Sequence, residues 1–224
     1  MFIKPCEGYV TSLFSGARLN PVLNIVRPHN GVDYGNASDN TIKAAASGTV
    51  TVAETNEKKN GYGRYIIIRH SDGKHTVYAH LQTVSVKVGQ AVKQGQRIGI
   101  KGTTGNSTGI HLHFEIRLNS SSSSAVDPLP YIVDPYAKEL QTLLNALGAK
   151  LTVDGRYGAA TVKAVADFQR KNKLVVDGAA GNKTMDLLRK QTPSKPVATP
   201  KPEGVTNVSK PNNTPSPSHS KAWE

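Results

Sequence analysis

The sequence predicts a mainly antiparallel β domain, followed by a small three-helix domain and a disordered tail. Apolar and polar residues alternate in short runs through residues 41–117, as they do in half-buried strands. The hydrophobic period then changes to that of a helix at Tyr136. Residues 193–224 hold 7 of the 13 prolines, and such a composition cannot bury a core. We therefore expect domains at residues 1–135 and 136–192, and a disordered tail beyond them.

The first domain should contain at least five strands. They are expected at residues 48–53, 65–70, 76–81, 96–100 and His111–Arg117. Residues 71–74 read Ser-Asp-Gly-Lys, a hairpin turn between two of these strands. Residues 9–14 also have the composition of a strand. Glycines recur after residue 89 and shorten the strands, so we expect no helix of ten residues between residues 41 and 117.

The second domain should contain three helices. The first carries an apolar stripe at Leu140, Leu143, Leu144 and Leu147. It is expected to end at Gly148, since glycine commonly terminates a helix. A second helix is expected at residues 161–173, and a third begins near Lys183. An internal repeat links them, because residues 153–161 and 176–184 both read V-D-G-x-x-G-x-x-T, a turn that leads into a helix.

Composition limits the possible partners. The chain has 224 residues and a net charge of +12, spread as +5, +5 and +2 over the three segments. A basic chain favours anionic polymers. No Lys/Arg run with interleaved aromatics and no nucleic-acid motif is present, so an anionic wall polymer such as a teichoic acid is the better candidate. Cys6 is the single cysteine, which excludes an internal disulfide. No apolar run has the length of a membrane span, and a monomer is the default expectation.

The residues that carry chemistry gather on the strand His111–Arg117. Alternation places one set of polar side chains on a single face: His111, His113, Glu115 and Arg117. Two histidines on one strand face can line a single site. Glu115 could act as a general base, or it could form a salt bridge at the rim of the site with Arg117 or Arg69.

A second histidine motif lies far upstream, where Asp33 follows His29 by four residues. Catalytic zinc commonly takes three protein ligands and leaves a position for water. His29, Asp33 and one histidine of the 111/113 pair fit that number. The remaining histidine and His80 would be available for proton transfer or for stabilising a tetrahedral intermediate. The spacing therefore predicts one zinc ion and a hydrolytic site.

Other motifs are better explained without a function. His70 and His75 lie near a predicted turn and are expected to be structural, and His219 lies in the tail. Residues 61–63 read Gly-Tyr-Gly but lack the third glycine of a dinucleotide-binding motif. Residues 88–99 are similar to the hairpin of biotinyl or lipoyl carriers. That alternative ranks low, because neither Lys93 nor Lys101 sits in the tight turn that a modified lysine requires.

Four ordered segments together resemble a known family. Residues 29–34 (H-N-G-V-D-Y), 78–81 (Y-A-H-L), 88–99 and 104–115 are similar to the successive motifs of the lysostaphin-type (LytM-like) zinc endopeptidases. The resemblance spans residues 8–133.

The resemblance implies an antiparallel, barrel-sandwich-like core with one zinc ion in a groove. It implies His29, Asp33 and His113 as ligands. It also implies His80 and His111 as the catalytic pair, which binds or deprotonates the attacking water and stabilises the oxyanion. The family cleaves peptide bonds of bacterial peptidoglycan, in stem peptides or in cross-bridges, and both kinds of bond stay open for this chain.

The second domain is similar to the helical peptidoglycan-binding domain of wall hydrolases, over residues 137–192, which implies anchoring to the wall. The start of the chain shows no signal-peptide pattern. The protein therefore looks like a phage endolysin. Such a protein would stay in the host cytoplasm until it reaches the wall at lysis, or it would be associated with the virion. The alternative function is a non-catalytic wall-binding or virion structural protein.

Overall fold

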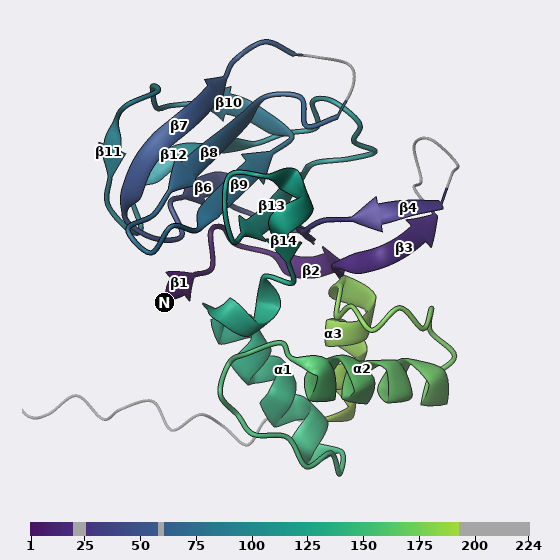
Figure 1. Ribbon diagram of the computed structural model, residues 1–224. Helices are drawn as coiled ribbons and strands as arrows, with labels where there is room; N and C mark the ends of the chain where they lie inside the picture. Colours follow the sequence, from purple (N-terminus) through teal and green to yellow (C-terminus); the bar gives the residue numbers. More distant parts are fainter. Residues whose placement is uncertain (20–25, 58–60, 193–224) are drawn as a thin grey trace, which may run out of the picture. The chain divides into compact units, whose positions relative to one another are not determined.

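The computed structural model describes residues 1–19, 26–57 and 61–192 (Figure 1). Within these ranges a set of β-strands is followed by three α-helices, and this confirms the predicted fold class. Among the strand pairs of the described residues, only β1 (Phe2–Ile3) and β15 (Ile132–Val133) run parallel. No helix in the described part is long and apolar enough to cross a membrane. The predicted disordered tail lies outside the described residues.

The largest sheet positions the residues of interest. Its order is β11-β7-β8-β9-β13-β5-β2, with β14 paired to β13. The strands are β2 (Tyr9–Ser12), β5 (Val32–Gly35), β7 (Gly48–Glu54), β8 (Tyr65–Arg69), β9 (His75–Ala79), β11 (Ala91–Val92), β13 (His111–Arg117) and β14 (Ala125–Val126). Because β13 lies between β9 and β5, it is held on both sides by antiparallel neighbours.

Besides the parallel pair of β1 and β15, two smaller sheets complete the described β region. One has the order β10-β12-β6, from Leu81–Val84, Arg97–Lys101 and Thr41–Lys43. The other is the hairpin of β3 (Ser15–Leu19) and β4 (Val26–His29). The three-stranded sheet and the large sheet contribute fully buried side chains to one core, among them Ile42, Leu81, Ile98, Ile66, Ile68 and Phe114. Burying one such side chain stabilises the fold by about 1.5–3 kcal/mol, so this core fixes the strands that carry the polar site.

The helical region comprises α1 (Pro135–Ala146), α2 (Ala159–Lys171) and α3 (Asn182–Gln191). The internal repeat folds the same way twice. In the first copy, Nε2 of Gln141 donates to Asp154 Oδ1 over 2.9 Å. In the second, Nε2 of Gln169 donates to Asp177 Oδ1 over 2.8 Å. Each buried amide thus joins a helix to the turn that precedes the next helix.

Each of the five strands expected between residues 41 and 117 has a counterpart, but one of them is interrupted and several short strands were not predicted. The expected strand at residues 76–81 is interrupted at His80, whose φ is 62°. Few residues other than glycine adopt this left-handed conformation. As a result β9 ends at Ala79 and β10 begins at Leu81. Asp33 lies on the short strand β5, which was not among the expected strands.

Candidate metal centre and active site

The register of the large sheet brings two distant segments of the chain together. His113 on β13 lies directly opposite Asp33 on β5. His29 is the last residue of β4, four positions before Asp33. Gly31 lies between them, and a Cβ at this position would be 2.3 Å from the carbonyl oxygen of Phe114. Only glycine permits this approach, which sets the His29 segment against β13.

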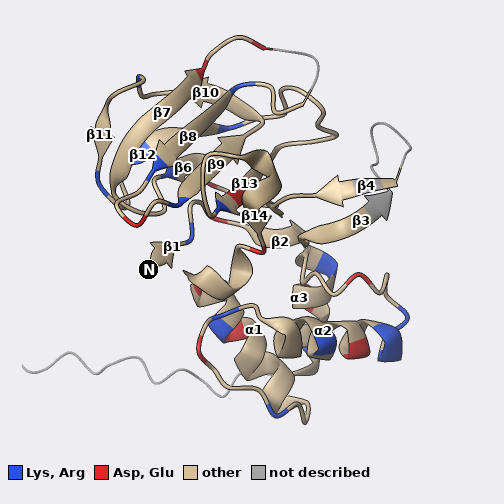
Figure 2. Cartoon of the chain, viewed as in Figure 1, with Lys and Arg blue, Asp and Glu red and all other residues tan. Residues whose placement is uncertain are grey.

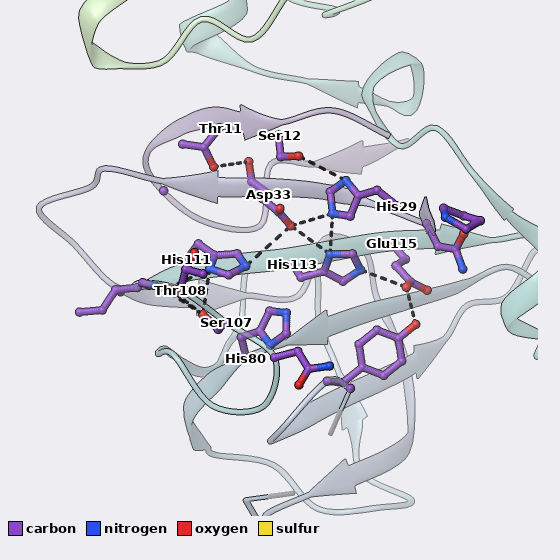
Figure 3. Close-up of a pocket in the computed structure, with 18 of the residues that line it drawn as sticks. Thr11, Ser12, His29, Asp33, His80, Ser107, Thr108, His111, His113 and Glu115 are labelled. Carbon is purple, nitrogen blue, oxygen red and sulfur yellow. Dashed lines mark hydrogen bonds and ion pairs between the residues drawn. The ribbon is translucent and has the colours of Figure 1, made fainter. Parts of the chain in front are cut away.

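The three predicted ligands converge on one point (Figure 3). Asp33 Oδ1 lies 3.0 Å from His29 Nε2 and 3.0 Å from His113 Nδ1. His29 Nε2 and His113 Nδ1 are 3.1 Å apart. All three residues are buried, and among the described residues they form the group whose donor atoms could hold a metal ion. Two imidazole nitrogens and one carboxylate oxygen match the donor set of a catalytic zinc ion and leave a coordination position open.

In both histidines of the cluster, the ring nitrogen that faces away from Asp33 has its own partner. His29 Nδ1 lies 2.7 Å from the carbonyl oxygen of Leu13, to which it donates. His113 Nε2 lies 3.0 Å from Glu115 Oε1, to which it donates. With the proton on the outer nitrogen, the inner nitrogen carries a lone pair that faces Asp33. The donor set and its hydrogen bonds therefore fit a bound zinc ion.

Two further imidazoles border the cluster. His111 Nε2 lies 3.8 Å from Asp33 Oδ1, and the ring centroids of His80 and His111 are 4.8 Å apart. His80 Nδ1 donates to the carbonyl oxygen of Thr104 over 2.8 Å. His111 Nδ1 donates to the carbonyl oxygen of Gly109 over 2.8 Å. Each ring therefore keeps Nε2 as a proton acceptor.

The environment of His80 keeps it uncharged. Burial, and then the neighbouring imidazoles of His111 and His113, lower its pKa to about 4. The unusual backbone at His80 is held because its N–H donates to the carbonyl oxygen of Tyr62 over 2.9 Å. A neutral, fixed imidazole can accept a proton near neutral pH.

In the metal-free cluster, a second proton on His113 supplies the positive charge that a metal ion would supply. Burial opposes a charge on His113, but hydrogen bonds to Asp33 and Glu115 outweigh it and raise the pKa of His113 to about 9. Burial likewise opposes the charge on Asp33, yet hydrogen bonds from His113 and His29 bring the pKa of Asp33 well below its usual range. A metal ion must displace the proton on His113 in order to bind.

The cluster lies in an open, mostly polar cleft of about 670 Å³. Among the residues that line it are Thr11, Ser12, Asn30, Asn36, Tyr62, Asn106, Ser107 and Thr108. Hydroxyl and amide groups of this kind can bind the backbone of an extended peptide. All five predicted site residues line the same cleft.

Glu115 corrects one part of the sequence-based interpretation. Its side chain is fully buried, not at a rim, and its oxygens are engaged by His113, Tyr62 and Arg117. It is therefore not placed to act as a general base on a substrate. Sequence reasoning missed Tyr62, whose hydroxyl donates to Glu115 Oε1 over 2.5 Å. The only signal was its place between two glycines, a pattern considered for nucleotides alone.

His70, expected to be structural, lies away from the cleft. Its Nδ1 lies 2.9 Å from the carbonyl oxygen of Ser47, and its Nε2 lies 2.8 Å from Thr76 Oγ1. Phe2 packs edge-on against the ring at 5.1 Å between centroids. These contacts satisfy both nitrogens with neutral partners, and His70 does not line the cleft.

A buried His/Asp/His cluster flanked by two imidazoles in a polar cleft is the arrangement expected of a metal-dependent hydrolase. The sequence comparisons agree. Residues 27–128 match the model of "Peptidase family M23", and residues 134–188 match that of a "Putative peptidoglycan binding domain". These matches indicate an M23 peptidase domain in residues 27–128, followed by a peptidoglycan-binding domain in residues 134–188.

Similar proteins include the peptidoglycan DD-endopeptidase ShyC of Vibrio cholerae, 44% identical over 110 residues, which are 49% of this chain and 25% of ShyC. The DD-carboxypeptidase/endopeptidase Mpg of Neisseria meningitidis is 40% identical over 111 residues, 50% of this chain and 25% of Mpg. The chain thus spans about a quarter of the length of these relatives. Among solved structures, the catalytic domain of lysostaphin from Staphylococcus simulans is 36% identical, with a TM-score of 0.45, over 58% of this chain and 91% of that domain.

Proposed function

We propose that the protein is a zinc-dependent endopeptidase that cuts amide bonds in the stem peptides or cross-bridges of bacterial peptidoglycan. The observation that carries this proposal is the convergence of His29, Asp33 and His113 in one cleft with His80 and His111. The similarity to peptidoglycan endopeptidases and the match of the helical region to a peptidoglycan-binding domain support the choice of substrate.

The five residues would divide the work. His29, Asp33 and His113 would hold the zinc ion, which lowers the pKa of a water molecule and polarises the substrate carbonyl. His80 and His111 each present Nε2 as an acceptor, because the proton of each neutral ring is on Nδ1, which donates a hydrogen bond to a backbone carbonyl. One ring would take the proton of the attacking water and pass it to the leaving amine. While it carries this proton, that ring would donate from Nε2 to the oxyanion, and the second ring would hold the water in place by accepting its other hydrogen at Nε2.

The helical region would hold the enzyme on its substrate. Figure 2 shows Lys and Arg positions both in the β region and on α2 and α3. Positive charge of this kind attracts anionic wall polymers as well as the wall itself. We propose peptidoglycan as the principal partner, an anionic polymer as a second, and a monomer as the active form.

The test is the clearing of purified cell walls, with and without a chelator, followed by mass spectrometry of the released peptides. We expect new amino termini that disappear on chelation and return with zinc, and their sequence names the bond that is cut. A protein that binds several wall types without releasing peptides would instead be a wall-binding protein.

A role as a phage endolysin is the finer part of the proposal. It requires that the protein is harmless in the cytoplasm and lytic once it reaches the wall. Expression in a host with and without a membrane-permeabilising agent tests this. Lysis that occurs only after permeabilisation is the expected result, and lysis without permeabilisation would contradict it.

A further inference from the structure

A buried charged network lies directly behind the ligand His113. Glu115 follows His113 by two residues on β13, so both side chains lie on the same face of the strand. Glu115 Oε1 accepts from His113 Nε2 at 3.0 Å and from the Tyr62 hydroxyl at 2.5 Å. Glu115 Oε2 accepts from Arg117 Nε at 2.7 Å. A terminal nitrogen of Arg117 also donates to the Tyr62 hydroxyl at 3.0 Å, which closes the network.

The direction of these bonds matters because a neutral imidazole carries only one N–H. If Nε2 of His113 holds the proton, Nδ1 has a lone pair and can bind a metal. An ionised carboxylate at Nε2 can only accept, so it favours this tautomer over the one that would block the metal position. His113 Nδ1 is the atom that lies 3.0 Å from Asp33 Oδ1.

The two ligand histidines are supported differently. His29 donates its outer proton to a neutral backbone carbonyl, that of Leu13. His113 donates its outer proton to a charged group that is itself completely buried. Burying a carboxylate is costly unless it is paired and hydrogen-bonded. Arg117, which is only 4% exposed, supplies that pairing.

We propose that Glu115, held in place by Arg117 and Tyr62, is the positioning residue that fixes the metal-binding tautomer and the ring orientation of His113, and thereby sets the zinc affinity of the site. This inference rests on the metal site of the proposed function, and it does not depend on which bond the enzyme cuts. Tyr62 joins the network to the cleft, because Tyr62 also lines it.

The experiment compares the zinc dissociation constant of the full chain with that of Glu115→Gln, by competition with a chromophoric chelator. Loss of an outer partner of this kind weakens metal binding by about 10–100-fold, and we expect a loss within that range. Nitrogen-15 NMR of the zinc-free protein, above the pKa of His113, should show Nε2–H in the wild type and a mixture of tautomers in the variant. Equal zinc affinity together with an unchanged tautomer would overturn the inference.

A matched control separates positioning from general loss of stability. Asp134 is also a buried carboxylate, paired with Lys4 Nζ at 2.9 Å and capping α1 at the Tyr136 N–H. Asp134→Asn should lower the melting temperature without changing zinc affinity or the His113 tautomer. If it weakens zinc binding as much as Glu115→Gln does, the role of Glu115 is only structural.

A second variant covers the case in which Glu115→Gln does not fold. Tyr62→Phe removes one of the two hydrogen bonds to Glu115 Oε1 and leaves the carboxylate paired with Arg117. We expect a severalfold loss of zinc affinity. An unchanged zinc affinity in Tyr62→Phe would contradict the proposal that Tyr62 helps to hold Glu115 in place. If the wild-type protein itself binds no zinc, both the proposed function and this inference are wrong.

Discussion

The cleft around His113 and the region around His70 use the same residue type in opposite ways. Both histidines are buried, and each has partners on both ring nitrogens. The partners of His70 are a carbonyl and a hydroxyl, and Phe2 covers its ring. The partners of His113 are two carboxylates, and its ring borders an open cleft. The difference shows that partner charge and access, not burial, distinguish a candidate ligand from a structural histidine.

The largest expected effect comes from exchanging each of these two histidines for alanine. His113→Ala removes a proposed zinc ligand, and several kcal/mol of transition-state stabilisation should go with it, so the proposed wall hydrolysis should fall by about a thousandfold or more. His70→Ala should cost about 1–3 kcal/mol in the free energy of unfolding, since it leaves buried polar groups unpaired. Hydrolysis by its folded fraction should persist. Rate assays and thermal melts on both variants measure this, and equal loss of activity would contradict the comparison.

The next effect concerns His80, which borders the proposed metal site but is not one of its three donors. His80→Ala should reduce hydrolysis by about 100–10,000-fold, the usual contribution of a general acid or base. Zinc affinity should change little, because His80 is not one of the three donors. Parallel measurements of rate and zinc content decide the matter, and a variant that loses its zinc would place His80 among the ligands instead.

The pH dependence of zinc affinity gives an intermediate effect. The pKa of His113 is raised to about 9, while that of Asp33 is held low. Between pH 7 and 8.5 zinc must therefore displace one proton, and the apparent dissociation constant should rise about tenfold for each unit that the pH falls. Calorimetry in buffers of different ionisation enthalpy measures the released proton. A pH-independent affinity would contradict the raised pKa.

The same shift makes a prediction for the metal-free protein. The pKa of His113 is higher in the folded protein than in the unfolded chain. Protonation of His113 therefore stabilises the folded state, and this contribution is fully present below pH 6.5. That contribution is lost as the pH rises toward 9. Melting temperatures of chelated protein across this window test the sign.

The smallest effect is expected at Ser12. Its hydroxyl lies 3.5 Å from His29 Nδ1, whereas the Leu13 carbonyl lies 2.7 Å from the same nitrogen. The shorter bond dominates, since hydrogen bonds weaken with distance. Ser12→Ala should therefore change zinc affinity less than about threefold, within the usual ±0.5 kcal/mol of a minor contact. A larger loss would mean that Ser12, and not Leu13, orients His29.

Much of the fold could be predicted because its signals are periodic. The strand His111–Arg117 was predicted with the bounds that the structure has, since seven alternating residues leave little choice. The helices begin within two residues of their predicted starts, where the hydrophobic period changes. The short strands β5, β6, β10 and β11 were not predicted, because two to four residues are too few to show a period.

The site was predictable in its residues more than in its contacts. Histidines and an aspartate at characteristic spacings indicated His29, Asp33 and His113, which the structure brings together. The left-handed backbone at His80 and the link between Tyr62 and Glu115 depend on tertiary packing, which no local pattern shows. Glu115 was the clearest case, because a carboxylate on a strand face ordinarily points to solvent.

The pairing of His113 with Asp33 also dictates when the site can exist during synthesis. The two residues lie 80 positions apart in the chain, and closing so long a loop carries a substantial entropic cost. Before residue 113 has been synthesised, the nascent chain lacks the metal-donor nitrogen of His113. It also lacks β13, which pairs with β5 in the finished sheet. Zinc loading should therefore follow completion of the sheet, so that bound metal reports a finished fold and does not guide the chain toward it.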